Sequence, residues 1–165
     1  MTDPKIFERN MLAIASWHGP LCAERLRSAV ADRRMGFSAT QGGSTVPYIT
    51  LDGRKVYLPS KFDPEREALR LADQYTKQGF YAFLGLGAGF GVSALLNAGR
   101  LTRGIIVEYN PGMLRAILEL IDMTHVLGDR RLRLFVDPSE AELDEALASS
   151  YVPSVTGDFV SVPLR

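Results

Sequence analysis

The sequence is poor in cysteine and histidine and has no excess of either charge. Its 19 basic residues balance its 19 acidic residues, so no net field favours a nucleic acid or an anionic membrane surface. A lone Cys22 excludes an intramolecular disulfide and fits a reducing compartment. No apolar run approaches the ~20 residues of a membrane span, and the first residues do not resemble a secretory signal. We therefore expect a cytoplasmic protein with neither a membrane nor a nucleic-acid partner.

The few residues suited to metal or thiol chemistry have no patterned partners. His18 and His125 lack a second His, Cys or acid at metal-ligand spacing, so we expect no metal site. Cys22 lies in a helical pattern, which favours a buried thiol over a nucleophile. Arginines cluster locally, and such clusters are more often solvated than bound to phosphate. These clusters are Arg25, Arg27, Arg33 and Arg34, and Arg130, Arg131 and Arg133.

The first 40 residues predict a helical hairpin. Apolar residues recur at three-to-four spacing from Pro4 to Trp17, which is typical of an amphipathic helix. The segment His18-Gly19-Pro20 ends this helix, and a second helical pattern follows that Gly36 is expected to close.

Residues 41–59 predict a β-hairpin. Two runs of β-forming residues, Thr45–Leu51 and Arg54–Leu58, flank Asp52-Gly53, a dipeptide that supplies the positive φ angles of a type I′ turn. Because proline has no N–H to donate, Pro47 suggests that its strand lies at a sheet edge.

Residues 60–165 predict a Rossmann-like α/β unit. Asp63 and Pro64 begin a helix, and buried strands at 80–84, 104–108 and 132–136 alternate with further helices. A fourth strand is expected at 158–162, near the end of the sequence. This β-α-β alternation implies a three-layer fold with a parallel sheet of about four strands. An end so close to a strand suggests a fragment or accessory domain of a longer protein.

A glycine-rich turn follows the first of these strands. Glycines at alternate positions let the chain turn tightly and let a ligand approach the backbone, while the next helix offers free N–H groups. We expect a nucleotide-like ligand here, although strand-to-helix packing alone can require the same glycines. The glycines are Gly85, Gly87, Gly89 and Gly91.

Two acidic residues end the next two strands. Glu108 lies just over twenty residues after the first glycine, where an acid conventionally accepts the ribose hydroxyls of a nucleotide. Asp137 occupies the equivalent position one unit later and could reach a base, although an exposed acid at a strand end is the simpler interpretation. Both belong to the predicted ligand site.

The alternating glycines resemble the first motif of class I S-adenosylmethionine-dependent methyltransferases. Such enzymes commonly have an acid two positions before the first glycine, where this chain has Phe83. Because the glycines favour this interpretation and Phe83 weighs against it, S-adenosylmethionine binding is an alternative hypothesis.

Several segments together resemble the N-terminal part of the motility accessory factor (Maf) proteins, and the likeness spans nearly the whole chain. The most specific segment is Ser60–Ala68, which reads SKFDPEREA. The others are Phe7–Asn10, Tyr48–Arg54, Leu58–Pro59, Leu84–Gly91 and Val107–Pro111.

This resemblance implies an accessory, nucleotide-binding-like domain of a bacterial glycosyltransferase. The intact protein would modify flagellin with nonulosonic acid sugars from cytidine-nucleotide donors, and its glycosyltransferase-like centre would follow this region. The family includes a branch similar to pterin pyrophosphokinases, so the sugar rests on membership alone. No catalytic residue is carried over. The ligand of the turn is open between a cytidine nucleotide-sugar and S-adenosylmethionine, and a third alternative is a structural interaction module with an empty turn.

Overall fold

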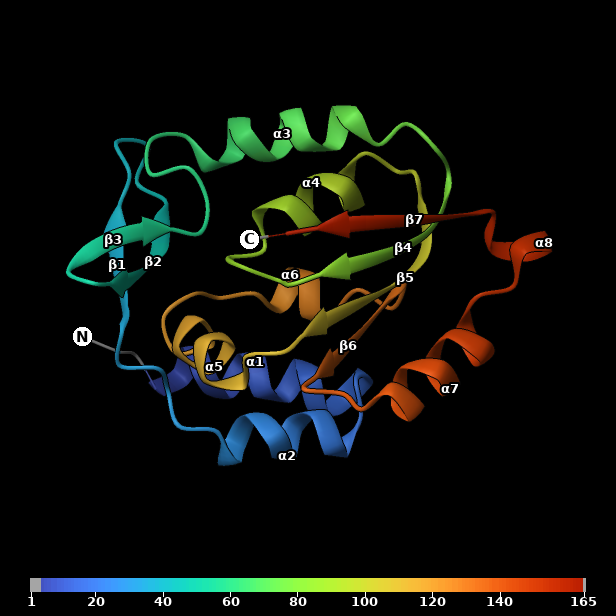
Figure 1. Cartoon of the computed structure of the whole chain (residues 1–165), viewed down its shortest axis with the longest axis horizontal. Helices are drawn as coiled ribbons and strands as arrows, with labels where there is room; N and C mark the ends of the chain where they lie inside the picture. Colours follow the sequence, from blue (N-terminus) through green and yellow to red (C-terminus); the bar gives the residue numbers. More distant parts are fainter. Residues whose placement is uncertain (1–3, 165) are drawn as a thin grey trace.

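A computed structural model describes residues 4–164, which form two sheets and the helices around them (Figure 1). The first half contains α1 (Pro4–Trp17), α2 (Pro20–Ser28), β1 (Met35–Ala39), β2 (Thr45–Leu51), β3 (Arg54–Tyr57), α3 (Pro64–Gln74) and β4 (Gly79–Leu84). The second half contains α4 (Phe90–Asn97), β5 (Leu101–Glu108), α5 (Pro111–Leu118), α6 (Thr124–Leu127), β6 (Leu132–Val136), α7 (Glu140–Ser150), α8 (Pro153–Thr156) and β7 (Asp158–Pro163).

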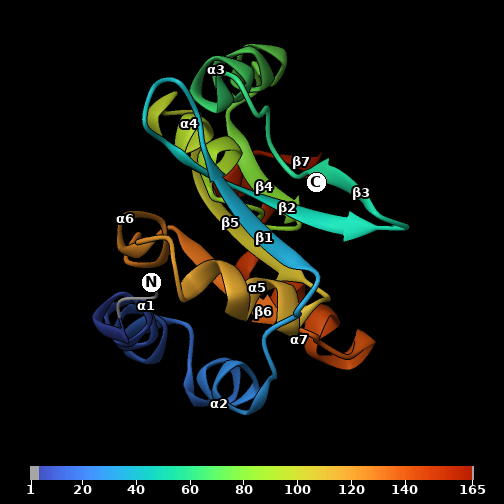
Figure 2. The same cartoon turned by 90° about the vertical axis from the view of Figure 1, so that its left-hand side faces the viewer.

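The larger sheet is parallel, with the strand order β6-β5-β4-β7. This order confirms the predicted four-stranded Rossmann-like sheet, including its last strand. The carboxyl ends of the strands point toward the smaller sheet, which stands across that edge (Figures 1 and 2). The smaller sheet is antiparallel and has the order β1-β2-β3.

The two faces of the parallel sheet are covered unequally. Alternate residues of β4 point to opposite faces, as the period of a strand requires. Tyr81 and Phe83 are fully buried in the main core, which also takes residues from α1 to α6. Phe80 and Ala82 belong to a smaller cluster that packs against α7. Helices α1 and α2 thus share the main core with the sheet.

Local signals at the helix starts act as the sequence predicts. The Asp63 carboxylate accepts a hydrogen bond from the Arg66 N–H at 2.9 Å, and Pro64 is the first residue of α3. Ser139 forms a capping box with Glu142 at the start of α7. Each cap satisfies N–H groups that the first turn of a helix leaves without an intrahelical acceptor.

The predicted β-hairpin is present, but its first strand is not at an edge. Asp52 and Gly53 have φ angles of 49° and 75°, as a type I′ turn requires. Strand β2 is central because β1 pairs with it. Pro47 is tolerated there because its carbonyl accepts from Leu58 N–H, just past the end of β3 at Tyr57. A residue's N and O point to the same side of a strand, so the missing N–H removes no bond to β1.

The expectation that Gly36 closes the second helix is wrong. Helix α2 ends at Ser28, and Gly36 lies within β1, directly opposite Tyr48. A Cβ atom at Gly36 would lie 2.4 Å from Cζ of the Tyr48 ring, so only glycine leaves room for that ring. The glycine marks a cross-strand contact that no local pattern reveals.

His18 ties the end of α1 to the sheet. Its Nδ1 accepts from the Leu134 N–H at 2.9 Å, so Nε2 carries the proton that is donated to the Leu127 carbonyl at 2.7 Å. Burial lowers the pKa of His18 to about 4, since a charged ring would be desolvated. The ring is therefore neutral at neutral pH.

We predict that His18 makes the protein less stable as the pH falls from about 6.5 to 4. The unfolded chain binds a proton at His18 near the ordinary pKa of 6.5, whereas the folded chain binds it only near pH 4. Between these values the free energy of unfolding therefore falls by up to about 1.4 kcal/mol for each pH unit. In urea unfolding, the advantage of the native chain over His18→Gln should shrink by about 2 kcal/mol between pH 7.5 and 4.5. An advantage independent of pH would contradict this assignment.

Candidate functional site

The glycine-rich turn lies between β4 and α4, at the carboxyl edge of the parallel sheet. Gly85, Gly87 and Gly89 have φ angles of 98°, 54° and 81°, in the region that residues with a Cβ atom rarely adopt. Gly89 is the N-cap of α4. The alternation of glycines therefore reflects three left-handed residues in one short turn.

Three of the four glycines are also packed against their own chain. A Cβ at Gly85 would lie 2.9 Å from the Leu164 carbonyl oxygen, and one at Gly89 would lie 2.6 Å from Cε of Met123. At Gly91 it would lie 2.9 Å from a Leu164 methyl carbon and 3.1 Å from a Leu71 methyl carbon. Close packing within the protein accounts for these positions without any ligand.

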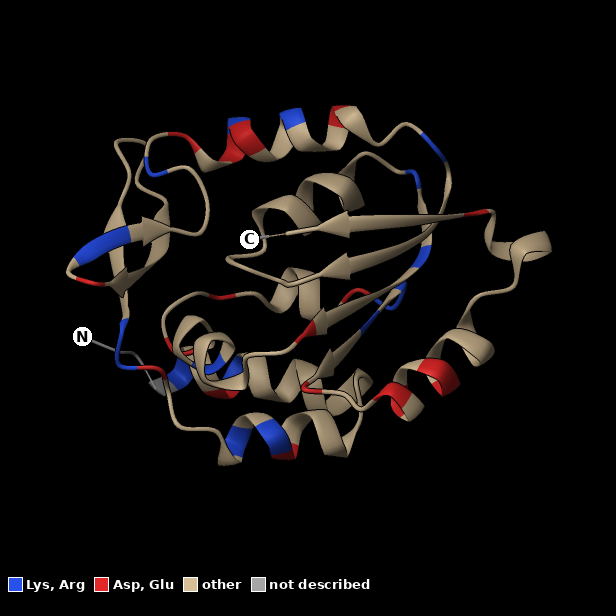
Figure 3. Cartoon of the chain, in the orientation of Figure 1, with Lys and Arg blue, Asp and Glu red and all other residues tan. Residues whose placement is uncertain are grey.

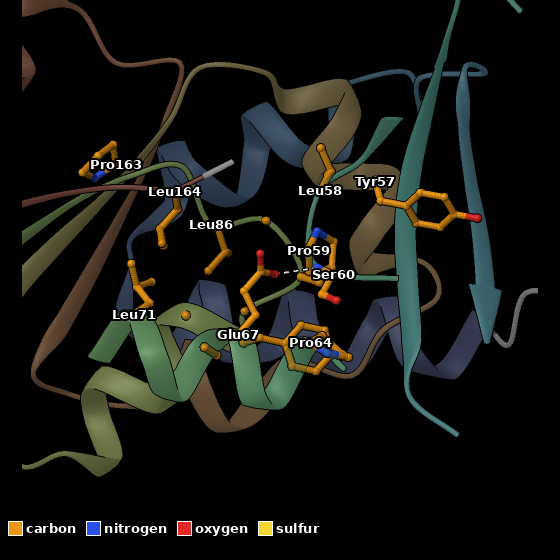
Figure 4. A pocket seen from close by; sticks show the side chains of 16 residues that line it. Tyr57, Leu58, Pro59, Ser60, Pro64, Glu67, Leu71, Leu86, Pro163 and Leu164 are labelled. Atoms are coloured by element: carbon orange, nitrogen blue, oxygen red, sulfur yellow. Dashed lines mark hydrogen bonds between the residues drawn. The ribbon is translucent and has the colours of Figure 1, made fainter. Parts of the chain in front are cut away.

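A cavity of about 370 Å³ opens beside the turn (Figure 4). One wall is the backbone from Leu86 to Gly91, and another is the inner face of α3 with Pro64, Glu67, Ala68 and Leu71. The remaining walls are the segment Tyr57–Ser60 and the end of β7 with Leu164. The volume falls within the range of small-molecule sites.

The polar groups of this cavity are few. Within residues 4–164, the N–H groups of Gly87 and Ala88 have no protein acceptor. Glu67 is the one charged residue among the described residues that line the cavity, and its carboxylate accepts from the Ser60 N–H (Figure 4). The walls offer free donors and one carboxylate, but no Lys or Arg side chain.

Glu108 lies beside the turn but does not line the cavity. Its two carboxylate oxygens accept from the chain itself, Oε2 from the Leu86 N–H at 3.3 Å and Oε1 from the Asn110 N–H at 3.0 Å. The predicted ribose-binding acid thus connects the ends of β4 and β5.

Asp137 lies apart from the cavity as well. Its side chain is exposed, and its φ angle of 46° is unusual for a residue other than glycine. Its N–H donates to the Glu108 carbonyl at 2.7 Å. The structure therefore gathers Gly87, Gly89 and Gly91 around the cavity and leaves Glu108 and Asp137 outside it.

A second cavity of about 380 Å³ lies on the other side of the turn. It shares Ala88, Gly89 and Phe90 with the first cavity. Ser93 from α4 and His125 from α6 meet here, with Oγ and Nε2 separated by 2.7 Å. No spacing in the sequence could indicate this pair, because 32 residues separate its members.

Most of the clustered arginines have acidic or aromatic partners. Basic α2 lies beside acidic α7 (Figure 3), and Arg25 makes two hydrogen bonds to Glu142 at 2.9 and 3.0 Å. Together with the Ser139 N–H, this contact lowers the pKa of Glu142 to about 2. The other contacts pair Arg27 with Glu8, Arg34 with Asp32, Arg131 with Asp129, and Arg130 and Arg133 with the Trp17 ring.

Thiol and metal chemistry receive little support from the geometry. Cys22 is buried, and desolvation raises the pKa of its thiol to about 12, so the thiolate nucleophile is not formed at neutral pH. Residues 4–164 contain no group of three or more His, Cys, Asp or Glu side chains placed to hold a metal ion. Over the same residues, no helix is both long and apolar enough to cross a membrane.

Sequence reasoning missed two residues of the cavity, Glu67 and Leu164. In the sequence, Glu67 is only an acid near the start of a predicted helix, and Leu164 follows the last strand without any motif. Their roles depend on the packing of α3 and β7 around β4. The buried positions Ala68 and Ala72 on one side of α3 are the available signal for which face turns inward.

No protein-family model and no curated protein matches this chain. Among solved structures, the fold of this chain is similar to part of the MAf glycosyltransferase from Magnetospirillum magneticum AMB-1, with a TM-score of 0.64 and 16% sequence identity. The match covers 96% of this chain and 32% of that chain, so this chain spans about a third of its length. The resemblance predicted from the sequence is thereby supported at the level of the fold.

We predict that Glu108→Gln destabilises the protein by about 1–3 kcal/mol, because an amide group cannot accept at both of its atoms and one backbone N–H loses its acceptor. Urea unfolding at 25 °C measures the change. Asp137→Asn is the matched control, since this exposed position should shift stability by no more than about 0.5 kcal/mol. Equal effects of the two variants would mean that the Glu108 contacts are not structural.

We also predict that Gly85→Ala costs more stability than Gly99→Ala. Both glycines have positive φ angles, but a Cβ at Gly99 meets no atom within 4 Å. Gly99→Ala therefore reports the left-handed strain alone, about 1–2 kcal/mol, whereas Gly85→Ala adds the contact with the Leu164 carbonyl. Thermal unfolding compares the two, and a larger loss for Gly99→Ala would exclude a packing role for Gly85.

Proposed function

We propose that this chain is an accessory, non-catalytic domain of a Maf-type glycosyltransferase. The observation that carries the proposal is the fold match, which includes nearly the whole chain but only 32% of the MAf glycosyltransferase. Catalysis would then belong to a glycosyltransferase-like domain that corresponds to the unmatched part of that protein. This domain is the proposed partner of the chain.

The proposed reaction of the whole protein follows from the family resemblance. A bacterial enzyme of this type would transfer nonulosonic acid sugars from cytidine-nucleotide donors to flagellin in the cytoplasm. The segment Ser60–Ala68, the most specific part of the resemblance, forms the loop before α3 and its first turns. Four of its residues, Ser60, Pro64, Glu67 and Ala68, line the cavity, so this segment has a structural reason to be distinctive.

The contacts of the candidate residues support a non-catalytic role. Glu108 is bound by two N–H groups of the chain, and Gly85, Gly89 and Gly91 are each packed against other residues. These contacts equally favour the interaction module with an empty turn. Nucleotide binding by the four glycines, Glu108 and Asp137 is a proposal that stands separately from the accessory role.

A second candidate function is S-adenosylmethionine binding. Left-handed glycines beside a cavity at the carboxyl edge of a parallel sheet favour it. Phe83 weighs against it, because a fully buried aromatic side chain stands where those methyltransferases commonly have an acid.

The proposal is tested by incubating the purified chain with flagellin and a cytidine-linked nonulosonic acid, and by measuring the intact mass of flagellin. A Maf glycosyltransferase that transfers this sugar serves as the positive control. We expect no added sugar with these 165 residues alone, because the proposal assigns catalysis to another domain. Addition of a sugar would overturn the accessory role, and addition of methyl groups in a parallel reaction with S-adenosylmethionine would establish the second candidate.

A further inference from the structure

The cavity between the glycine-rich turn and α3 has a composition that selects among ligands. Sixteen residues from four segments line it, and Glu67 carries the one formal charge among them. Apolar side chains cover much of the wall, notably Leu58, Leu71, Leu86 and Leu164. A bound molecule would therefore meet leucine side chains, one carboxylate and a short stretch of backbone N–H groups.

We propose that this cavity binds a phosphate-free ligand of nucleoside size, uncharged or positively charged. The ligand would place an apolar ring system among the leucines. It would offer an acceptor to the N–H groups of Gly87 and Ala88, and a hydroxyl or ammonium donor to Glu67. This inference goes beyond the proposed accessory function and does not depend on it.

The charge of Glu67 disfavours a phosphorylated ligand inside the cavity. A phosphate group would have to lie near the Glu67 carboxylate without a lining Lys or Arg to neutralise it. Like charges at close range raise the free energy of binding. The free N–H groups and the amino end of α4 attract an anion as well as a neutral acceptor, so the selection against phosphate rests on Glu67 and on the missing lysine or arginine.

The two arginines of α3 do not line the cavity. Arg66 and Arg70 line a neighbouring hollow, which shares Ser60, Glu67 and Leu71 with the cavity. A phosphate that used these arginines would sit outside the walls formed by the turn. The two placements are distinguishable, because one involves the amides of Gly87 and Ala88 and the other involves the arginines.

The location agrees with a general property of parallel sheets. Ligands bind outside the carboxyl ends of the strands, and this cavity lies at that end, with the last residues of β7 and the turn after β4 as two of its walls. Glu108 contacts the turn through the Leu86 N–H and lines neither this cavity nor its neighbours. A ribose at Glu108 is therefore not part of this binding mode.

The test uses matched pairs of probes that differ in phosphate. Adenosine and ADP, cytidine and cytidine monophosphate, and S-adenosylmethionine are titrated into the native chain by calorimetry and by two-dimensional amide NMR. We expect at least one phosphate-free probe to bind about tenfold or more tightly than its phosphorylated partner, or S-adenosylmethionine to bind in their place. The amide signals of Gly87 and Ala88 should shift, whereas that of Asp137 should not.

Charge removal provides the second arm. Glu67→Gln should narrow the preference for the phosphate-free probe by about tenfold, and Glu145→Gln, which removes the same charge from the exposed face of α7, should leave it unchanged. Circular dichroism checks that both variants are folded. The proposal is overturned if no probe binds, or if binding leaves the amide signals of Gly87 and Ala88 unshifted. It is also overturned if the phosphorylated probe binds more tightly than its phosphate-free partner, or if the binding of the phosphorylated probe is lost in Arg70→Gln. The flagellin assay tests the accessory role independently.

Discussion

The carboxylate of Glu108 connects two turns at the carboxyl edge of the parallel sheet. By accepting from the N–H groups of Leu86 and Asn110, it joins the turn after β4 to the turn after β5. Asn110 in turn caps α5 by accepting from the Met113 N–H. One acidic side chain therefore sets the position of the glycine-rich turn relative to the neighbouring strand. An acid at this position is compatible with a ribose contact, but its two backbone hydrogen bonds already give it a structural role.

Close approach of backbones imposes a second constraint on the same edge. The last strand, β7, pairs with β4, and its end brings Leu164 against both Gly85 and Gly91. A Cβ atom at Gly85 would collide with the Leu164 carbonyl oxygen, and one at Gly91 would press against a methyl group of the Leu164 side chain. Glycines that suggest a ligand in the sequence are thus also the residues that let β7 complete the sheet.

Turn and helix-cap signals within a few residues made much of the fold predictable. Elements that depend on contacts between distant residues could not be predicted. Asp52-Gly53 and Asp63-Pro64 each determine a turn or a helix start within a few residues, so these elements appear where the sequence places them. Strand β1 could not be predicted from local sequence, because Gly36 is required by a contact with the Tyr48 ring on the neighbouring strand. For the site, the turn itself was predictable, whereas the walls that α3 and the end of β7 add to it, and the backbone contacts of Glu108, are non-local.

The walls around the turn, more than the turn itself, decide what it can hold. Alternating glycines provide free N–H groups and room for a backbone contact, and these properties suit many acceptors equally. The selection comes from α3, which turns Glu67 and Leu71 toward the turn and leaves Arg66 and Arg70 on the neighbouring hollow. A rotation of α3 by one residue about its axis, roughly 100° at 3.6 residues per turn, would exchange the carboxylate for a guanidinium. The proposed ligand chemistry therefore depends on which face α3 turns toward the cavity, and the buried Ala68 and Ala72 fix that face.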